Sequence, residues 1–495
     1  MSTHNLLQLP AEEPFLWRDK ADAFSRYVST PENRVMFTNS LGHPHFTAFV
    51  NGDEGELITF GGIVVGKLLR GEDVSSLIPS LADYFSEVAE MFVNNASGLR
   101  QEYWYLMYVN ALAGAIIRRE SSADTMRLSR FRQSLDTMMR IAHEIEYDFN
   151  HQGYDFAARS SYTNKDAFRQ PDTIGGYAYL MTLGYNLYGD EQYLNEAHLA
   201  MNKYLAFAEN PWYEIPSGAM AVAAASKLSS MGYQVDVSKA IDFALDPDKG
   251  CLHLGEWGGR EINGLMCGWR GNTREEALSM TYSLESMVAI PYLLSSLRYT
   301  PEYASSIAPY VLHASINMRW FFSEYLPRNM QSKPDLTEDV PYEALHREEN
   351  GKTPYATGDF HDHRSVYGGS LILWLGEIIR PTEHPYILQL NLSLADFLTE
   401  TSYPTFLYYN PYGDRRQITH RLPIGAFDIY CLNRHAMVST RTEGSFVIEL
   451  DALETFIVVV IPAGSTPQVD GPVLKMGNIV VDFQREGHSH SSDSK

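Results

Sequence analysis

The stretch from Asp172 to Asn210 reads "DTIGGYAYLMTLGYNLYGD" followed by "EQYLNEAHLAMNKYLAFAEN", and its two parts differ in character. The first part, residues 172–190, is almost entirely apolar and is rich in glycine and aromatic residues. The second part, residues 191–210, carries charged residues on one side of a helical repeat. A helix that is apolar all round must be buried on every side, whereas an amphipathic helix can face water. This stretch therefore predicts an inner helix packed behind an outer one.

The same alternation recurs along residues 57–390 and predicts two concentric rings of helices. The apolar members are residues 56–71, 100–120, 172–190, 214–232, 273–299 and 364–381. The amphipathic members are residues 74–95, 123–149, 191–210, 237–247 and 301–326. This arrangement resembles the (α/α)6 toroid of the six-hairpin glycosidase and polysaccharide lyase superfamily. The resemblance rests on architecture and implies a carbohydrate-active enzyme.

The pattern changes after residue 390 and divides the chain. Short β-rich runs such as "SFVIELD" and "TFIVVVIPAG" are separated by turn residues. We therefore expect a mainly α protein in which a small antiparallel β domain, residues 391–485, follows the toroid of residues 57–390. Residues 1–56 are expected to pack on the ring, and the polar tail of residues 486–495 is expected to be disordered.

Composition limits the partners and the compartment. The 495 residues carry a formal charge of −22, which disfavours nucleic acid and anionic membranes as partners. The three cysteines, Cys251, Cys267 and Cys431, show no metal-binding spacing and read as reduced core thiols. No secretory signal and no apolar run of membrane-spanning length is visible. These features predict a cytoplasmic protein that needs no cofactor and no metal and acts on an oligosaccharide; a homo-oligomer is left open.

Three long loops precede apolar members and should emerge at one end of the ring, at the N-termini of the inner helices. They span residues 150–171, 247–272 and 326–362, and long loops in a compact domain are usually functional. Aromatic side chains there can stack on sugar rings, and polar ones can bind hydroxyls. The expected substrate-binding residues are His361, Arg270, Trp269, Trp257, Asn164, Tyr355 and Tyr367.

Carboxyls at this end are the candidate catalytic groups. Asp359 lies in "GDFHDHR", outside the capping position before the last apolar member, and is the first choice. Asp172 could equally be a helix N-cap, Glu214 reads as a cap or a solvated acid, and Glu261 lies in a Gly/Trp-rich loop. The expected catalytic set is Asp359, Asp172, Glu261, His363 and Tyr162.

Four functions fit these residues. A glycoside hydrolase needs two carboxyls about the scissile bond, and we prefer it because the chain is acidic. A lyase acting on uronates would use Tyr162 and His363 to move protons, and Arg159 to neutralise the substrate. A metal enzyme would join "HPH" at His43 with "HDH" at His361. A non-catalytic sugar-binding protein is the fourth alternative.

Overall fold

A computed structural model describes residues 6–52, 55–95, 98–120, 124–347, 364–399 and 401–484. Its centre is a ring of helices in six positions. The helices are α2 (Leu57–Leu69), α3 (Tyr103–Arg119), α5 (Thr173–Tyr188), α7 (Ile215–Ser230), α10 (Ser283–Ser296), and α12 (Val366–Gly369) with α13 (Ile372–Ile378) in the sixth position. Contacts run from each to the next in this order, and α12 and α13 return to α2. The closed ring confirms the predicted toroid.

Burial explains why these helices are apolar all round. Every residue of α10 is buried, and so is every residue of α7 except Ser229. The ring also needs small residues where helices approach closely. A Cβ on Gly175 of α5 would lie 2.6 Å from the Cβ of Ala221 on α7. The glycine-rich composition of the inner members therefore permits the tight ring.

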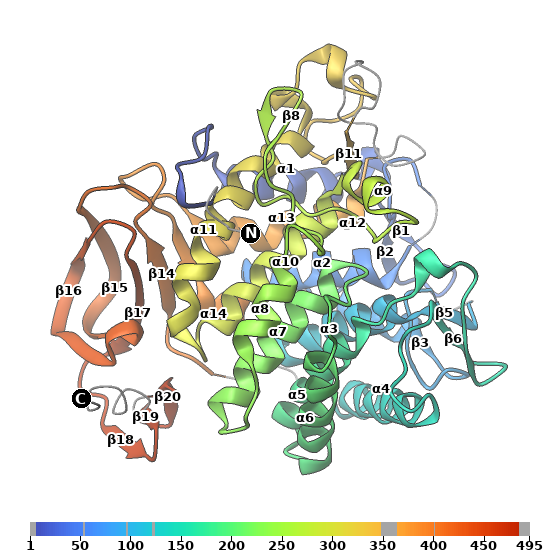
Figure 1. The fold of residues 1–495 in the computed structure, drawn as a ribbon, viewed down its shortest axis with the longest axis horizontal. Helices are drawn as coiled ribbons and strands as arrows, with labels where there is room; N and C mark the ends of the chain where they lie inside the picture. The colour runs from blue at the N-terminus through green and yellow to red at the C-terminus, as the bar shows by residue number, and fades with distance from the viewer. Residues whose placement is uncertain are drawn as a thin grey trace.

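A second set of helices covers the ring from outside, and all but the one at residues 304–317, which is almost fully buried, are amphipathic. They are α1 (Trp17–Ser29), α4 (Thr125–Glu144), α6 (Glu191–Leu205), α8 (Val237–Ala244) and α11 (Ala304–Asn317). Helix α4 packs on α3 and α5, α6 on α5 and α7, α8 on α7, and α11 on α10. The N-terminal helix α1 packs on α13, so the segment that precedes the toroid covers the sixth position of the ring (Figure 1).

One predicted outer helix is absent from the structure. Residues 74–95 were expected to be an amphipathic helix, but they form the 3-10 helix η3 (Ile78–Tyr84) and the strand pair β3 (Phe85–Ser86) and β4 (Met91–Phe92). Glu90 has a φ of 55° in the turn between the strands, a conformation that an α-helix does not allow. This expectation is wrong, because a chain reversal replaces the second half of the helix.

Short elements join the helices. The 3-10 segments are η2 (Pro31–Asn33), η4 (Asp166–Phe168), η5 (Pro301–Tyr303), η6 (Met318–Phe321), η7 (Ser323–Tyr325) and η8 (Arg328–Met330), and α9 spans Arg274–Leu278. Antiparallel pairs are β1 (Met36–Thr38) with β2 (Pro44–Phe46), β8 (Glu256–Trp257) with β9 (Arg260–Glu261), and β10 (Met280–Tyr282) with β11 (Ala344–His346). A three-stranded sheet contains β5 (Arg100–Glu102), β6 (Gly153–Asp155) and β7 (Ser160–Tyr162). This sheet is important for the candidate site because its strand β5 leads directly into α3.

The C-terminal part is β-rich, as expected, but its sheet begins earlier than residue 391. The strands are β12 (Ile379–Arg380), β13 (Gln389–Asn391), β14 (Thr405–Tyr409), β15 (Arg416–Cys431), β16 (Ala436–Leu450) and β17 (Thr455–Pro462), in the order β12-β13-β14-β17-β15-β16. Strands β14 and β17 pack on α11, and α14 (Leu392–Ala395) packs on β14 (Figure 1). The 3-10 segment η9 (Leu432–Arg434) and a separate sheet of β18 (Pro467–Asp470), β19 (Val473–Met476) and β20 (Ile479–Asp482) complete it. The expected tail lies outside the described residues.

Candidate functional site

Carboxyl side chains mark the starts of the inner helices. Glu102 and Glu214 immediately precede α3 and α7, and Glu285 lies in the first turn of α10. Glu343 reaches the sixth position, because it accepts a hydrogen bond from the Tyr367 hydroxyl on α12. The full set, which we call the acidic end of the ring, is Glu56, Glu102, Asp172, Glu214, Glu285 and Glu343.

These acids are not helix caps. The carboxyls of Glu56, Glu102, Asp172 and Glu214 make no capping hydrogen bond, although each stands in the N-cap position. On the outer helices, Asp124, Asp190 and Asp236 do cap α4, α6 and α8, each by accepting a backbone N–H. The expectation that Glu214 is a cap or a solvated acid is therefore wrong, since Glu214 is also buried. Capping of α5 by Asp172 is excluded in the same way.

Glu214 and Glu285 form a buried carboxyl pair. Their side chains lie within hydrogen-bonding reach of each other, and Glu285 is only 4% exposed. Burial raises the pKa of Glu285 to about 8. Burial, and then repulsion by Glu285, Glu102 and Asp172, raises the pKa of Glu214 well above its usual range. One oxygen of each carboxyl finds no donor among the described residues, and a proton shared between them removes that deficit. Burial and the neighbouring carboxyls therefore favour the protonated form of the pair.

Glu102 has a different environment. Its Oε1 accepts a hydrogen bond from Gln152 Nε2 at 2.9 Å, and its Oε2 accepts one from Gln170 Nε2 at 2.8 Å. Both glutamines are buried, and both donors are neutral. Hydrogen bonds accepted at both oxygens suit a carboxylate, because a protonated carboxyl must use one oxygen as a donor.

Asp172 holds the turn that carries Glu214. Its Oδ2 accepts hydrogen bonds from the backbone N–H groups of Tyr213 at 2.8 Å and Glu214 at 3.2 Å. Burial raises the pKa of Asp172 to about 7, although these two N–H groups and the Arg270 charge act against it. Asp172 thus lies at the acidic end, as the sequence suggested, where it positions the backbone of Glu214.

Aromatic rings stand among the carboxyls. Tyr105 is half-buried and lies within electrostatic range of Glu56, Glu214, Glu102 and Glu285. Tyr367, another half-buried ring, bonds to Glu343 and packs edge-on against Phe49 at 5.5 Å between ring centroids. Flat apolar faces beside carboxyl oxygens are the surface that a sugar ring uses, since it presents C–H groups to one and hydroxyls to the other.

The structure places the predicted loop residues in different regions. Tyr162 is on β7, with the Arg100 guanidinium 5.4 Å from its ring centroid, and Asn164 donates its backbone N–H to Gln152 Oε1 at 3.1 Å. Trp269 packs against Tyr282, with 6.0 Å between the ring centroids, and Tyr282 directly precedes α10. Arg270 donates to the carbonyl of Asp166. Four further candidates, Tyr355, Asp359, His361 and His363, lie outside the described residues.

Glu261 lies elsewhere, against the outer helix α11. It accepts hydrogen bonds from His313 Nδ1 at 2.6 Å, from Asn317 Nδ2 at 3.1 Å and from the backbone N–H of Ala11 at 2.8 Å. Burial opposes these contacts, but together they lower the pKa of Glu261 to about 2. Its neighbour Trp257 packs on His253 at 5.1 Å between ring centroids. Glu261 therefore ties the N-terminal segment to α11 and is no part of the acidic end.

The "HPH" histidines share one carboxylate. His43 Nδ1 lies 2.9 Å and His45 Nε2 3.0 Å from Asp83 Oδ2, and Asn39 Nδ2 donates to the same oxygen at 2.7 Å. In the part of the chain that the structure describes, no cluster of three His, Cys, Asp or Glu side chains is arranged to hold a metal ion. Nor is any helix there both long enough and apolar enough to cross a membrane.

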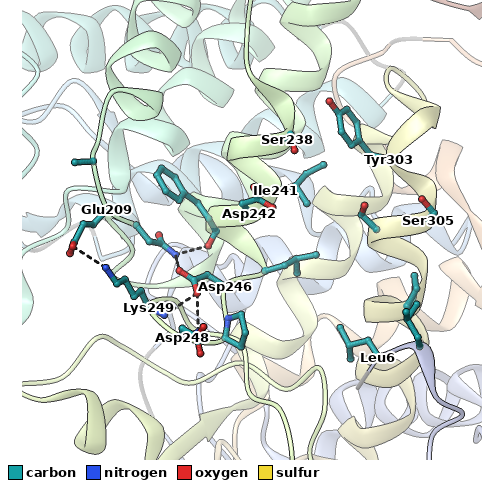
Figure 2. A pocket seen from close by; sticks show the side chains of 18 residues that line it. Leu6, Glu209, Ser238, Ile241, Asp242, Asp246, Asp248, Lys249, Tyr303 and Ser305 are labelled. Carbon is teal, nitrogen blue, oxygen red and sulfur yellow. Dashed lines mark hydrogen bonds and ion pairs between the residues drawn. The ribbon is translucent and has the colours of Figure 1, made fainter. Parts of the chain in front are cut away.

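A cavity of about 880 Å³ opens on the outer side of the ring, between α8 and α11 (Figure 2). It is lined by Asp242 and Ile241 of α8, by Ser305 of α11 and by Leu6 of the N-terminal segment. None of the six carboxyls of the acidic end lines it. The cavity is therefore separate from the candidate site.

The most informative residues, Glu102 and Glu285, were missed from the sequence. Glu285 is the only charged residue in "SLESMVAIPYLLSS", and an acid inside a helix that is apolar on every side signals a buried carboxyl. Glu102 directly precedes the apolar run "YWYLMYVNALAGAII". Both residues lie at the starts of inner helices, outside the long loops in which the candidate residues were expected.

Comparison with known proteins yields structural similarity only. No family profile and no curated protein sequence matches this chain. Similar solved structures include a family 76 glycoside hydrolase (mannosidase) from Bacteroides thetaiotaomicron, with a TM-score of 0.48 and 10% identity over 73% of this chain and 98% of that one. Cellobiose 2-epimerase from Bacillus thermoamylovorans has a TM-score of 0.49 and 9% identity over 72% of this chain and 98% of that one. The α-1,6-mannanase from Salegentibacter sp. has a TM-score of 0.38 and 13% identity over 72% of this chain and 98% of that one. These similarities are too weak to assign an activity, and the toroid is defined by its own helix contacts.

Proposed function

We propose that the protein is a glycoside hydrolase that cleaves neutral oligosaccharides at the acidic end of its helical ring. The observation that carries this proposal is the buried Glu214–Glu285 pair, in which burial and neighbouring carboxyls raise the pKa and so favour the protonated form. A leaving alcohol needs a proton as its bond to the anomeric carbon breaks, and a carboxyl with a raised pKa supplies it. The second carboxyl that hydrolysis requires comes from the remaining acids.

Charge favours a neutral substrate. The carboxyls of Glu285, Glu102 and Asp172 each act electrostatically on Glu214, so a carboxylate on the substrate would meet repulsion there. A uronate lyase needs a cation to neutralise that carboxylate. Arg159, the arginine that the sequence offered for this role, is instead ion-paired with Glu144 of the outer helix α4. The lyase alternative is therefore disfavoured.

The proposed reaction uses water. The shared proton of Glu214 and Glu285 passes to the glycosidic oxygen as the bond between that oxygen and the anomeric carbon breaks. A water oxygen forms the new bond to the anomeric carbon, either directly or after a carboxylate has held it, and the water proton returns to the enzyme. Tyr105 and Tyr367 support the sugar rings beside the carboxyls.

The test is a product analysis in ¹⁸O-labelled water. Purified protein is incubated with neutral and uronate-containing oligosaccharides, and the products are weighed by mass spectrometry. We expect neutral substrates to be cleaved with one labelled oxygen in each new reducing end. The double variant Glu214→Gln/Glu285→Gln, prepared identically, controls for contaminating glycosidases. Cleavage without incorporated label, an unsaturated uronate product, or rearrangement without cleavage would contradict the proposal.

A further inference from the structure

The Glu102 carboxylate is fixed in one orientation by a fork of two amides. Gln152 and Gln170 donate to its two oxygens, and each amide is itself held at its other end. Gln152 Oε1 accepts the backbone N–H of Asn164 at 3.1 Å, and Gln170 Oε1 accepts that of Trp104 at 2.9 Å. Because each amide oxygen faces a backbone N–H, each NH₂ group must face Glu102.

The fork orients Glu102 without neutralising it. An arginine in the same place would cancel the negative charge, whereas an amide contributes only a dipole. Glu102 is therefore oriented by neutral donors alone, within electrostatic range of Glu214. Acid–base catalysis uses carboxyls whose environments differ in this way.

Local backbone structure brings the fork together. Glu102 on β5 pairs with Gly153 on β6, and Gly153 pairs with Tyr162 on β7. A Cβ on Gly153 would lie 2.1 Å from the carbonyl oxygen of Gln101, so only glycine lets β6 lie this close to β5. Gln152 is thereby carried to the start of α3, where Glu102 lies.

On this geometry, and resting on the proposed function, we propose that Glu102 is the second catalytic carboxylate and that Gln152 and Gln170 are its positioning residues. Glu102 removes a proton from water as the water oxygen bonds to the anomeric carbon. The glycosidic oxygen leaves with the proton of the Glu214–Glu285 pair. One proton then returns from Glu102 to the pair, so the enzyme is restored and one water has been consumed.

Chemical rescue tests the catalytic part. Glu102→Gln should reduce kcat/KM by about 10²–10⁴-fold, the usual contribution of an acid–base group, while its melting temperature stays close to wild type. In Glu102→Ala, the empty space admits azide, whose nitrogen bonds to the anomeric carbon without needing a base. We expect azide to restore turnover with an activated glycoside and to yield a glycosyl azide. A structural role for Glu102 would produce no such adduct.

The positioning part is tested with Gln170→Glu. This change keeps the acceptor for the Trp104 N–H, but it replaces the donor to Glu102 with a repelling carboxylate. One Glu102 oxygen then loses its hydrogen bond and faces a second carboxylate. We expect kcat to fall at least tenfold and the acidic limb of the kcat/KM profile to move to higher pH. The other charged or titratable side chains in the surroundings of Glu102 are Asp172, Glu214, Glu285 and Arg100. The control is Glu144→Gln, which removes contacts of Tyr154 and Arg159 on the outer side of the same hairpin and should leave the profile unchanged.

The outcomes separate the two proposals. If wild-type protein cleaves no glycoside, the proposed function fails. If wild type cleaves but Glu102→Gln retains turnover within a few-fold, or azide gives no adduct, hydrolysis stands and Glu102 is not the second carboxylate. If Gln170→Glu leaves the pH profile in place, the fork is structural only.

Discussion

At the basic end of the inner ring, which we define by Arg119, Lys227, Arg298 and Asp396, each buried charge meets a partner. Asp396 is ion-paired with Arg298 and accepts the Tyr299 hydroxyl at 2.7 Å. Arg119 donates to the backbone carbonyl of Asp396 at 3.2 Å, and the Lys227 ammonium lies 4.6 Å from the Tyr299 ring centroid.

At the acidic end, Glu214 and Glu285 face each other, and one oxygen of each carboxyl has no hydrogen-bond donor among the described residues. Helix dipoles explain the signs at both ends, because acids are favoured at helix N-termini and cations at C-termini. They do not explain why one oxygen of each carboxyl in the buried Glu214–Glu285 pair has no donor among the described residues. Unsatisfied buried groups cost stability and persist where they serve chemistry. The difference supports our proposal that the acidic end acts on substrate, while the basic end stabilises the ring.

The largest effect is expected when a carboxyl of the acidic end is made neutral. Glu285→Gln keeps the size of the side chain and removes its proton chemistry. We expect kcat/KM to fall by about 10²–10⁴-fold, while the melting temperature stays equal or rises, since a buried ionisable group has been removed. Turnover assays and calorimetry on the same preparation measure both. A collapse in stability with normal specific activity would show that the pair is structural.

The converse change is Asp396→Asn at the basic end. It leaves Arg298 buried without its counter-charge, which typically costs about 3–5 kcal/mol. We expect the free energy of unfolding in urea to fall by this amount, whereas kcat per folded molecule stays near wild type. Unaltered stability combined with lost activity would reverse the roles of the two ends.

Much of this comparison was predictable from the sequence, and some was not. The ring was confirmed because burial on every side leaves a clear pattern, as in α7 and α10. The prediction of a helix over residues 74–95 is wrong, because an amphipathic pattern does not reveal the chain reversal at Glu90. The carboxyl pair needs contacts between Glu214 and Glu285, which are 71 positions apart in the numbering, and no local pattern reports such a contact.

A smaller effect is expected from Gly153→Ala, which sharpens the link between backbone and site. The added Cβ would press on the backbone of Gln101 and Glu102 and force β5 away from β6, at a cost of about 1–3 kcal/mol. We expect kcat to fall together with stability, because the fork on Glu102 opens. Gly189→Ala serves as control, since a Cβ there meets no atom within 4 Å and its cost is confined to its left-handed backbone. Equal kcat in the two variants would contradict the fork.

The last expected effect is a pH dependence of stability. The Glu285 pKa is raised from 4.5 to about 8 in the folded protein. Between these values the folded state binds more protons than the unfolded state, so stability falls as pH rises, by at most about 1.4 kcal/mol per pH unit. The stability of Glu285→Gln relative to wild type should therefore increase from pH 4.5 to 8 in urea titrations. Glu261→Gln is the matched contrast: the low Glu261 pKa stabilises wild type above pH 4.5, and this advantage is lost as pH falls toward 2. A flat difference for Glu285→Gln would exclude the raised pKa.

On the proposed mechanism, Glu214 and Glu285 share one proton at neutral pH. Infrared difference spectroscopy between wild type and Glu285→Gln tests it directly, because a protonated carboxyl has a carbonyl stretching band that a carboxylate lacks. We predict that wild type shows this band near neutral pH, that Glu285→Gln weakens or shifts it, and that it titrates away above pH 8. Only carboxylate bands at neutral pH, identical in both proteins, would contradict the account.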